Sequence, residues 1–239
     1  MAPTFTKFSE EVFNSVRHID GLPHDEFKDP SEDFKKLVYA HNLTDVVGIT
    51  LTHKHMDIRE NEVIVGSFDS VNNKVVITYR AITADDGDLT EDWIPFQFVY
   101  GANFGWMPVA YWDVRSSGSA VMKAKFDKIK GSTFLSDLST ILQNQETGGI
   151  ANFGICLLFH SLIEGHETGL VETTDTHERT QWFRVEASLA ASQFSKVTTI
   201  WHWNPELFED NCVVGCLTSG GSHTGSYHAH YNGGGWEAI

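Results

Sequence analysis

The feature that most limits the possible folds is a segment of alternating apolar and polar residues that occurs twice in the chain. Residues 46–82 predict three strands separated by two short turns, because apolar side chains recur at every second position. Shifted by 106 residues without a gap, the Gly-Ile-Thr-Leu of residues 48–51 falls on the Gly-Ile-Cys-Leu of residues 154–157, and Asp69 falls on Asp175. The apolar positions of the two segments stay in phase over the strands that follow, which is typical of a repeated structural unit.

Amphipathic helices are predicted before and between these segments. Residues 8–19 carry apolar side chains at helical spacing after Ser9, a good N-cap residue. A second helix is expected after Pro30, and a third after Ser132. Each copy of the strand pattern therefore follows a helix.

The sequence thus predicts a β-rich α+β protein that forms one domain over residues 1–239. Two pseudo-repeated units of helix, β-hairpin and strand, approximately residues 30–80 and 132–186, would pack into one continuous antiparallel β core, a barrel or a sandwich, because isolated hairpins are too weak to stand alone. The alternative is that two unrelated amphipathic hairpins match by chance. Residues 218–239 are rich in Gly and His and predict a C-terminal loop or tail.

Charge and composition argue against several classes of partner. The chain has 32 acidic and 17 basic residues, a net charge of −15, so phosphate backbones and anionic lipids would repel it. No stretch approaches the roughly 18 apolar residues that span a bilayer, and the first residues do not form a signal peptide. The chain has 3 cysteines, too few for a disulfide framework. We therefore expect a cytoplasmic protein that binds neither nucleic acid nor membrane, and a homodimer is left open.

The segment that indicates chemistry contains His53 and His55. Residues i and i+2 of a strand point to the same face, roughly 6.5–7 Å apart, so the two imidazoles can converge on one cation. Glu60 follows in the predicted turn and adds a carboxylate. His228 and His230 form a second His-x-His near the C-terminus. Nitrogen and carboxylate ligands in this combination predict a site for Zn or Fe.

The spacing of His53, His55 and Glu60, followed by a glycine, resembles the first metal-binding motif of the cupins. Residues 225–232 resemble the end of the second cupin motif and include His228. The resemblance covers a small part of the chain, and the glycine of the first motif comes one residue early. It implies a β-barrel in which His53, His55, Glu60 and His228 hold one metal ion.

These patterns lead to three functional hypotheses. The first is a Zn- or non-haem-Fe-dependent hydrolase, lyase or oxygenase that acts on a small organic molecule. The second is a non-catalytic protein that binds a small ligand or associates with itself, and whose histidines are structural. The third is acid–base catalysis by a histidine without a metal. The sequence contains no nucleotide-binding glycine loop and no serine nucleophile elbow.

Overall fold

The computed structural model describes residues 5–18, 32–83, 93–143, 146–147, 149–165, 171–184, 195–202, 212–219, 222–232 and 235–237. These residues form four α-helices and a 3₁₀ turn, together with a large sheet and a two-stranded ribbon. The helices are α1 (Glu10–Ser15), α2 (Glu32–Ala40), α3 (Ser119–Lys130) and α4 (Phe134–Leu142), and the 3₁₀ turn is η4 (His160–Leu162). The ribbon consists of β6 (Glu146–Thr147) and β7 (Ile150–Ala151).

Twelve strands form the large sheet. In chain order they are β1 (Val47–Leu51), β2 (Glu62–Asp69), β3 (Lys74–Ala81), β4 (Ile94–Gly101), β5 (Gly105–Trp112), β8 (Phe153–Leu157), β9 (Val171–Asp175), β10 (Thr180–Arg184), β11 (Ser195–His202), β12 (Cys212–Ser219), β13 (Ser222–Asn232) and β14 (Gly235–Glu237). The predicted β-rich α+β class is therefore confirmed.

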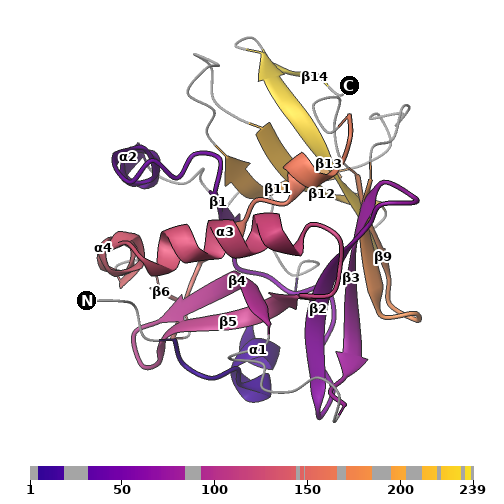
Figure 1. The fold of residues 1–239 in the computed structure, drawn as a ribbon, viewed down its shortest axis with the longest axis horizontal. Helices are drawn as coiled ribbons and strands as arrows, with labels where there is room; N and C mark the ends of the chain where they lie inside the picture. The colour runs from indigo at the N-terminus through magenta and orange to yellow at the C-terminus, as the bar shows by residue number, and fades with distance from the viewer. Residues whose placement is uncertain are drawn as a thin grey trace.

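Eight of these strands curl into a half-barrel in the order β1-β8-β4-β5-β2-β3-β10-β9 (Figure 1). Strand β11 pairs with β1, β12 pairs with β11, and β13 pairs with both β12 and β9, so the pairings connect the two edges of the half-barrel. The sheet is mixed, because β2 and β5 run parallel, with Val65 opposite Tyr111. The expectation of a wholly antiparallel core is wrong at this pairing.

The helices α2, α3 and α4 lie on one side of the curled sheet (Figure 1). Helix α3 packs on β4 and β8, and α2 packs on α4. The sequence analysis did not predict α3. Its buried residues Met122, Phe126 and Ile129 have the spacing of one helix face, but exposed lysines and a glycine-containing loop surround them.

The N-terminal helix is shorter than predicted, although its cap is confirmed. The hydroxyl of Ser9 accepts a hydrogen bond from the backbone N–H of Val12 at 3.3 Å. Phe13, which is 4% exposed, points into the main hydrophobic core. On β2, Ile64 joins that core, whereas Val63 and Val65 face a second cluster around Trp93 on the opposite face.

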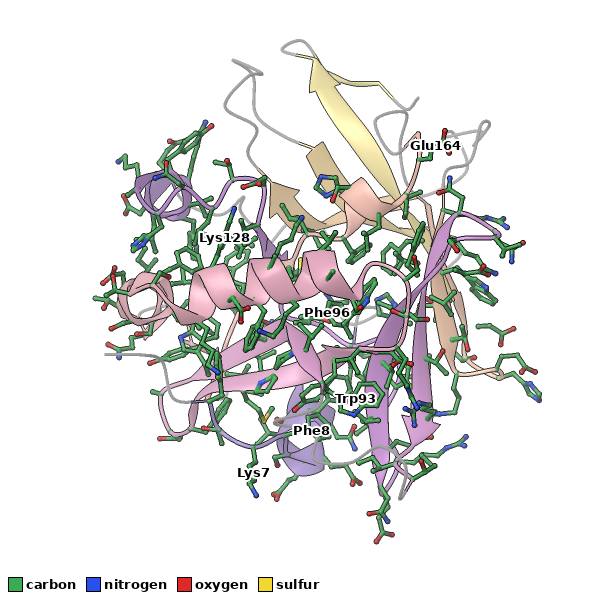
Figure 2. The ribbon with its side chains drawn as sticks, viewed as in Figure 1. Lys7, Phe8, Trp93, Phe96, Lys128 and Glu164 are labelled. Atoms are coloured by element: carbon green, nitrogen blue, oxygen red, sulfur yellow. The ribbon has the colours of Figure 1, made fainter. Side chains whose placement is uncertain are left out.

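Phe8 packs on this second cluster, and Figure 2 shows it beside Trp93. The segment before α1 thus covers the outer face of β2. Both faces of that strand are buried, which explains why residues 62–66 are all buried although only alternate positions face the barrel. Among the described residues, none of the helices has the length and apolar composition needed to cross a membrane.

The two halves of the chain meet at two strand pairs. Strand β1 pairs antiparallel with β8, and Ile49 lies opposite Ile155. Strand β3 pairs antiparallel with β10, and Val76 lies opposite Trp182. The two residues of each of these pairs are 106 positions apart in the sequence, the offset of the predicted repeat. The internal duplication stays a prediction, because these pairings describe the contact between the halves and not their common shape.

The C-terminal segment differs from the expectation of a loop or tail. Residues 222–232 form β13, which pairs with β12 on one side and with β9 on the other. Pairing with β12 along most of its length, and with β9 at Ser226 and Tyr227, satisfies many of its backbone groups, and this outweighs the low β-propensity of Gly225.

Candidate functional site

A cavity lies between the curled sheet and α1. The centre of a water molecule fits into about 60 Å³ of it, which corresponds to roughly four to six water-sized groups. Most of its wall is apolar and includes Phe96, which is labelled in Figure 2. The residues that line it are Phe13, Val16, Thr50, Thr52, His53, His55, Ile64, Ile77, Tyr79, Phe96, Gln97, Val99, Val109, Cys156, Phe159, Gln181, Phe183 and Ile200.

His53 and His55 lie together on the wall of this cavity. Strand β1 ends at Leu51, so the two histidines belong to the irregular segment that follows and not to a strand as expected. Their Nε2 atoms are 3.2 Å apart, and the ring centroids are 4.9 Å apart at an angle of 65°. The structure therefore brings the two imidazoles into hydrogen-bond contact through their far nitrogens.

The hydrogen bonds around the pair assign the protons of its neutral form. Nδ1 of His53 lies 2.7 Å from the carbonyl oxygen of Leu51, and because a carbonyl only accepts, this nitrogen carries the proton. Nε2 of neutral His53 is then an acceptor, so Nε2 of His55 donates to it.

Contacts from α1 and the residues just after it fix the backbone of this segment. The amide of Asn14 both donates to the carbonyl of Ile58 and accepts from its N–H, each at 2.9 Å. Nε2 of His18 donates to the carbonyl of His55 at 2.7 Å. The buried ammonium of Lys54 is 2.6 Å from the carboxylate of Asp57 and also donates to the backbone of α1. Helix α1 therefore closes the cavity and holds the histidine segment.

A buried ion pair supports the same segment from the other side. Arg179 has a positive φ of 52° in the turn between β9 and β10. Its guanidinium donates through Nε to Glu62 at 3.0 Å and through Nη2 to the second carboxylate oxygen at 2.5 Å. It also donates to the carbonyl of Asp57 at 2.8 Å. The side chains of Arg179 and Glu62 are 12% and 8% exposed, so solvent screens this pair little.

The other predicted ligands are not brought to the pair by anything the structure describes. Glu60 is exposed in the turn before β2. His228 and His230 lie on β13, opposite Val214 and Cys212 of β12, and their side chains lie outside the described residues. Across the described part of the chain, no group of three or more His, Cys, Asp or Glu side chains is arranged to hold a metal ion.

Cys156 lines the cavity but does not supply a reactive thiolate. It is 3% exposed, and burial raises the pKa of its thiol to about 12, although the nearby Lys125 and a backbone hydrogen bond lower it somewhat. A neutral thiol is a poor nucleophile and a poor metal ligand. Its burial makes this cysteine a small residue of the core.

Four threonine and glutamine residues of the cavity wall were not predicted from the sequence: Thr50, Thr52, Gln97 and Gln181. Gln181 is 4% exposed, because its position in β10 has the same inward direction as Phe183. A polar residue at an inward position would have been recognisable from its phase with Phe183, if the direction of that strand had been known.

Comparisons of the chain with protein-family models, with curated proteins and with solved structures gave no match.

Proposed function

We propose that the protein binds a small organic molecule in the barrel cavity and that His53 and His55 act on it as a proton-transfer pair. The observation that supports this most directly is the 3.2 Å contact between the two Nε2 atoms on the cavity wall. A histidine titrates close to neutral pH, so such a pair can both accept and return a proton under physiological conditions.

The two imidazoles have different roles in this proposal. His55 is the base, and it takes up the proton through Nδ1, because its Nε2 already donates to Nε2 of His53. When Nδ1 takes a proton from the bound molecule, His55 becomes positively charged and its Nε2–H donates more strongly to Nε2 of His53. His53 is the positioning residue, and its own Nδ1–H is held by the carbonyl of Leu51 at 2.7 Å. The return of the proton to the molecule restores the neutral pair.

A divalent metal held by the same pair is the second candidate. Two ligand nitrogens at 2.0–2.1 Å from a tetrahedral ion are about 3.3 Å apart, which is close to the 3.2 Å between these Nε2 atoms. The carbonyl of Leu51 would orient His53 as outer-shell partners orient metal-binding histidines. A bound metal would polarise a substrate oxygen or activate water. Glu60 is exposed, so a third protein ligand would come from His228 or His230.

Nuclear magnetic resonance of the ring nitrogens tests the proton-transfer pair. With ¹⁵N-labelled histidine, we expect His53 to be protonated at Nδ1 and His55 at Nε2 in the neutral state, and the two rings to titrate as a coupled pair. His53→Phe should change the pKa of His55. Independent titration of the two rings, or a proton on Nε2 of neutral His53, would contradict the proposal.

Elemental analysis of protein purified without an affinity tag separates the two candidates. Stoichiometric Zn or Fe that is lost in a His53→Ala, His55→Ala double variant would support the metal site. Metal-free protein with the expected tautomers would support the proton-transfer pair. A double variant with unchanged stability and unchanged ligand binding would instead favour a non-catalytic binding protein.

We also propose that the fold arose by internal duplication. In support, α2 and β1 to β5 are followed along the chain by α4 and β8 to β12 in the same order. Thr50 and Cys156, and likewise His53 and Phe159, are 106 positions apart and line the same cavity. Spin labels at two surface positions of the first half, and at the positions 106 residues later, should report equal distances. Unequal distances would contradict the duplication.

A further inference from the structure

The cavity wall carries two polar groups that lack a protein partner. Within the part of the chain that the structure describes, Nε2 of Gln181 and the hydroxyl of Thr52 have no hydrogen-bond partner. The two side chains belong to residues that are 4% and 9% exposed, and both line the cavity. A buried donor without a partner destabilises the folded state, so groups of this kind usually meet a ligand or ordered water.

The remainder of the wall defines the charge of an occupant. Among the residues that the structure describes, none of those that line the cavity is an aspartate, glutamate, lysine or arginine. The thiol of Cys156 stays protonated at neutral pH, because burial raises its pKa to about 12. Apart from the two histidines, the described wall offers no charge that could replace the lost hydration of an ionic ligand. The cavity therefore fits a neutral molecule.

The wall also defines the shape and polarity of that molecule. Phe159 packs edge-on against Phe183 with ring centroids 4.9 Å apart, and Phe96 lies 6.4 Å from Phe159. These rings form an apolar surface for a hydrocarbon portion of the ligand. Gln181 lies on β10 next to Phe183 on the inward face, so its N–H donor borders this surface.

We infer that the cavity binds a small neutral carbonyl compound and that the amide of Gln181 donates a hydrogen bond to its carbonyl oxygen. This inference rests on the proposed function for the identity of the cavity, and it adds the substrate class and a binding residue. Thr52 provides a second polar contact. The hydrocarbon part of the molecule lies against the phenylalanines, and its size is limited to about four to six water-sized groups by the cavity of about 60 Å³.

The probes are butanone and 2-methyl-1-butene. The two molecules have nearly the same shape, but only butanone has an oxygen atom that accepts a hydrogen bond. They are titrated into the ¹⁵N-labelled full-length chain. We expect the side-chain amide signals of Gln181 to shift with butanone and not with the alkene. A site built around a hydrogen-bond donor rejects a ligand that leaves the donor unpaired, so butanone should bind more tightly.

Gln181→Met keeps the length of the side chain and removes the donor. The dissociation constant of butanone should rise about tenfold, while that of the alkene should stay within about twofold. Gln97→Met is the matched control, because Gln97 lines the same cavity and is more exposed. Its effect on butanone should stay below about twofold. Gln181→Asn, which retains a shortened amide, provides a second variant if Gln181→Met fails to fold.

The inference is overturned if butanone and the alkene bind equally, if the wild type binds neither, or if Gln97→Met weakens butanone binding as much as Gln181→Met does. His53→Phe separates this test from that of the proposed function. Butanone binding that persists in His53→Phe, together with uncoupled titration of the wild-type rings, would refute the proton-transfer pair and leave the carbonyl site standing. Coupled titration of the two rings, together with unchanged butanone binding in Gln181→Met, would refute the carbonyl site and leave the proton-transfer pair standing.

Discussion

Replacing Lys125 with methionine should stabilise the protein at neutral pH. Lys125 lies on α3 where this helix packs on β8, and its ammonium donates to the carbonyl of Leu158 at 2.6 Å. Burial lowers the pKa of its amine, attraction to Asp45 partly opposes this, and the net result is a fall from 10.5 to about 8. The folded state therefore disfavours the charged amine.

The size of the effect follows from this pKa. A change from 10.5 to about 8 corresponds to about 3 kcal/mol, since each unit is worth about 1.4 kcal/mol. At pH 7 the amine is charged in both the folded and the unfolded chain. The burial of this charge then destabilises the folded state by the full amount. Between pH 8 and 10.5 the unfolded chain binds more protons than the folded one, so stability rises with pH there.

Methionine keeps most of the apolar contact of the lysine stem but leaves the carbonyl of Leu158 without its donor, at a cost of about 1 kcal/mol. Lys125→Met should therefore gain about 2 kcal/mol at pH 7, and its advantage over the wild type should disappear as the pH approaches 10.

Urea unfolding at several pH values between 7 and 10, followed by circular dichroism, measures this difference. Lys128→Met is the matched control. Lys128, which is labelled in Figure 2, also lies on α3 and is exposed, and its ammonium is 3.9 Å from the carboxylate of Asp45. Its replacement should change the unfolding free energy by less than about 0.5 kcal/mol at every pH. Destabilisation by Lys125→Met at pH 7, or a difference from wild type that does not depend on pH, would refute the reasoning.

Four further predictions concern the frame around the cavity. Arg179→Met leaves the carboxylate of Glu62 buried without its guanidinium and should lower the unfolding free energy by about 3–5 kcal/mol, and adding Glu62→Gln should recover part of this loss in urea titrations. Gly154→Ala would place a methyl group 2.3 Å from a carbonyl oxygen of β4, so the melting temperature should fall, and unchanged melting would contradict this packing. Asn14→Ala removes two hydrogen bonds to the histidine segment and should cost about 2 kcal/mol while shifting the imidazole resonances, and unshifted resonances would argue against the clamp. Cys156 should react with iodoacetamide at pH 8 only in unfolded protein, because burial raises its pKa to about 12, and rapid labelling of the native chain would contradict this.

Much of the fold was predictable where local patterns decide the structure. The alternation over residues 62–81 predicted β2 and β3 with their turn, and Ser9 predicted the start of α1. Helix α3 was missed because its three buried residues are separated by lysines and its start follows a glycine. The parallel pairing of β2 with β5 was not predictable, because it joins residues far apart in the chain.

The site was predicted only in part. The His-x-His pattern led to the correct two residues of the cavity wall, but for a reason that the structure changes. His53 and His55 do not share a strand face, and their rings meet because the chain bends after Leu51 and is held by Asn14. Gln181 was missed, because a sequence does not show which polar residue of a strand faces inward until the sheet closes around it.

The distribution of polar residues in the barrel is itself an argument for function. An interior filled with leucine, valine and phenylalanine would be more stable than one that buries Thr52 and Gln181 without hydrogen-bond partners among the described residues. His53 and Phe159 show the two alternatives, one polar and one apolar. Phe159 lies 106 residues after His53, and both residues line the cavity. At this pair of positions the first half has an imidazole and the second half has an aromatic ring. Selection for stability alone would favour an apolar wall, and the buried polar groups therefore support the proposal that the cavity holds a ligand.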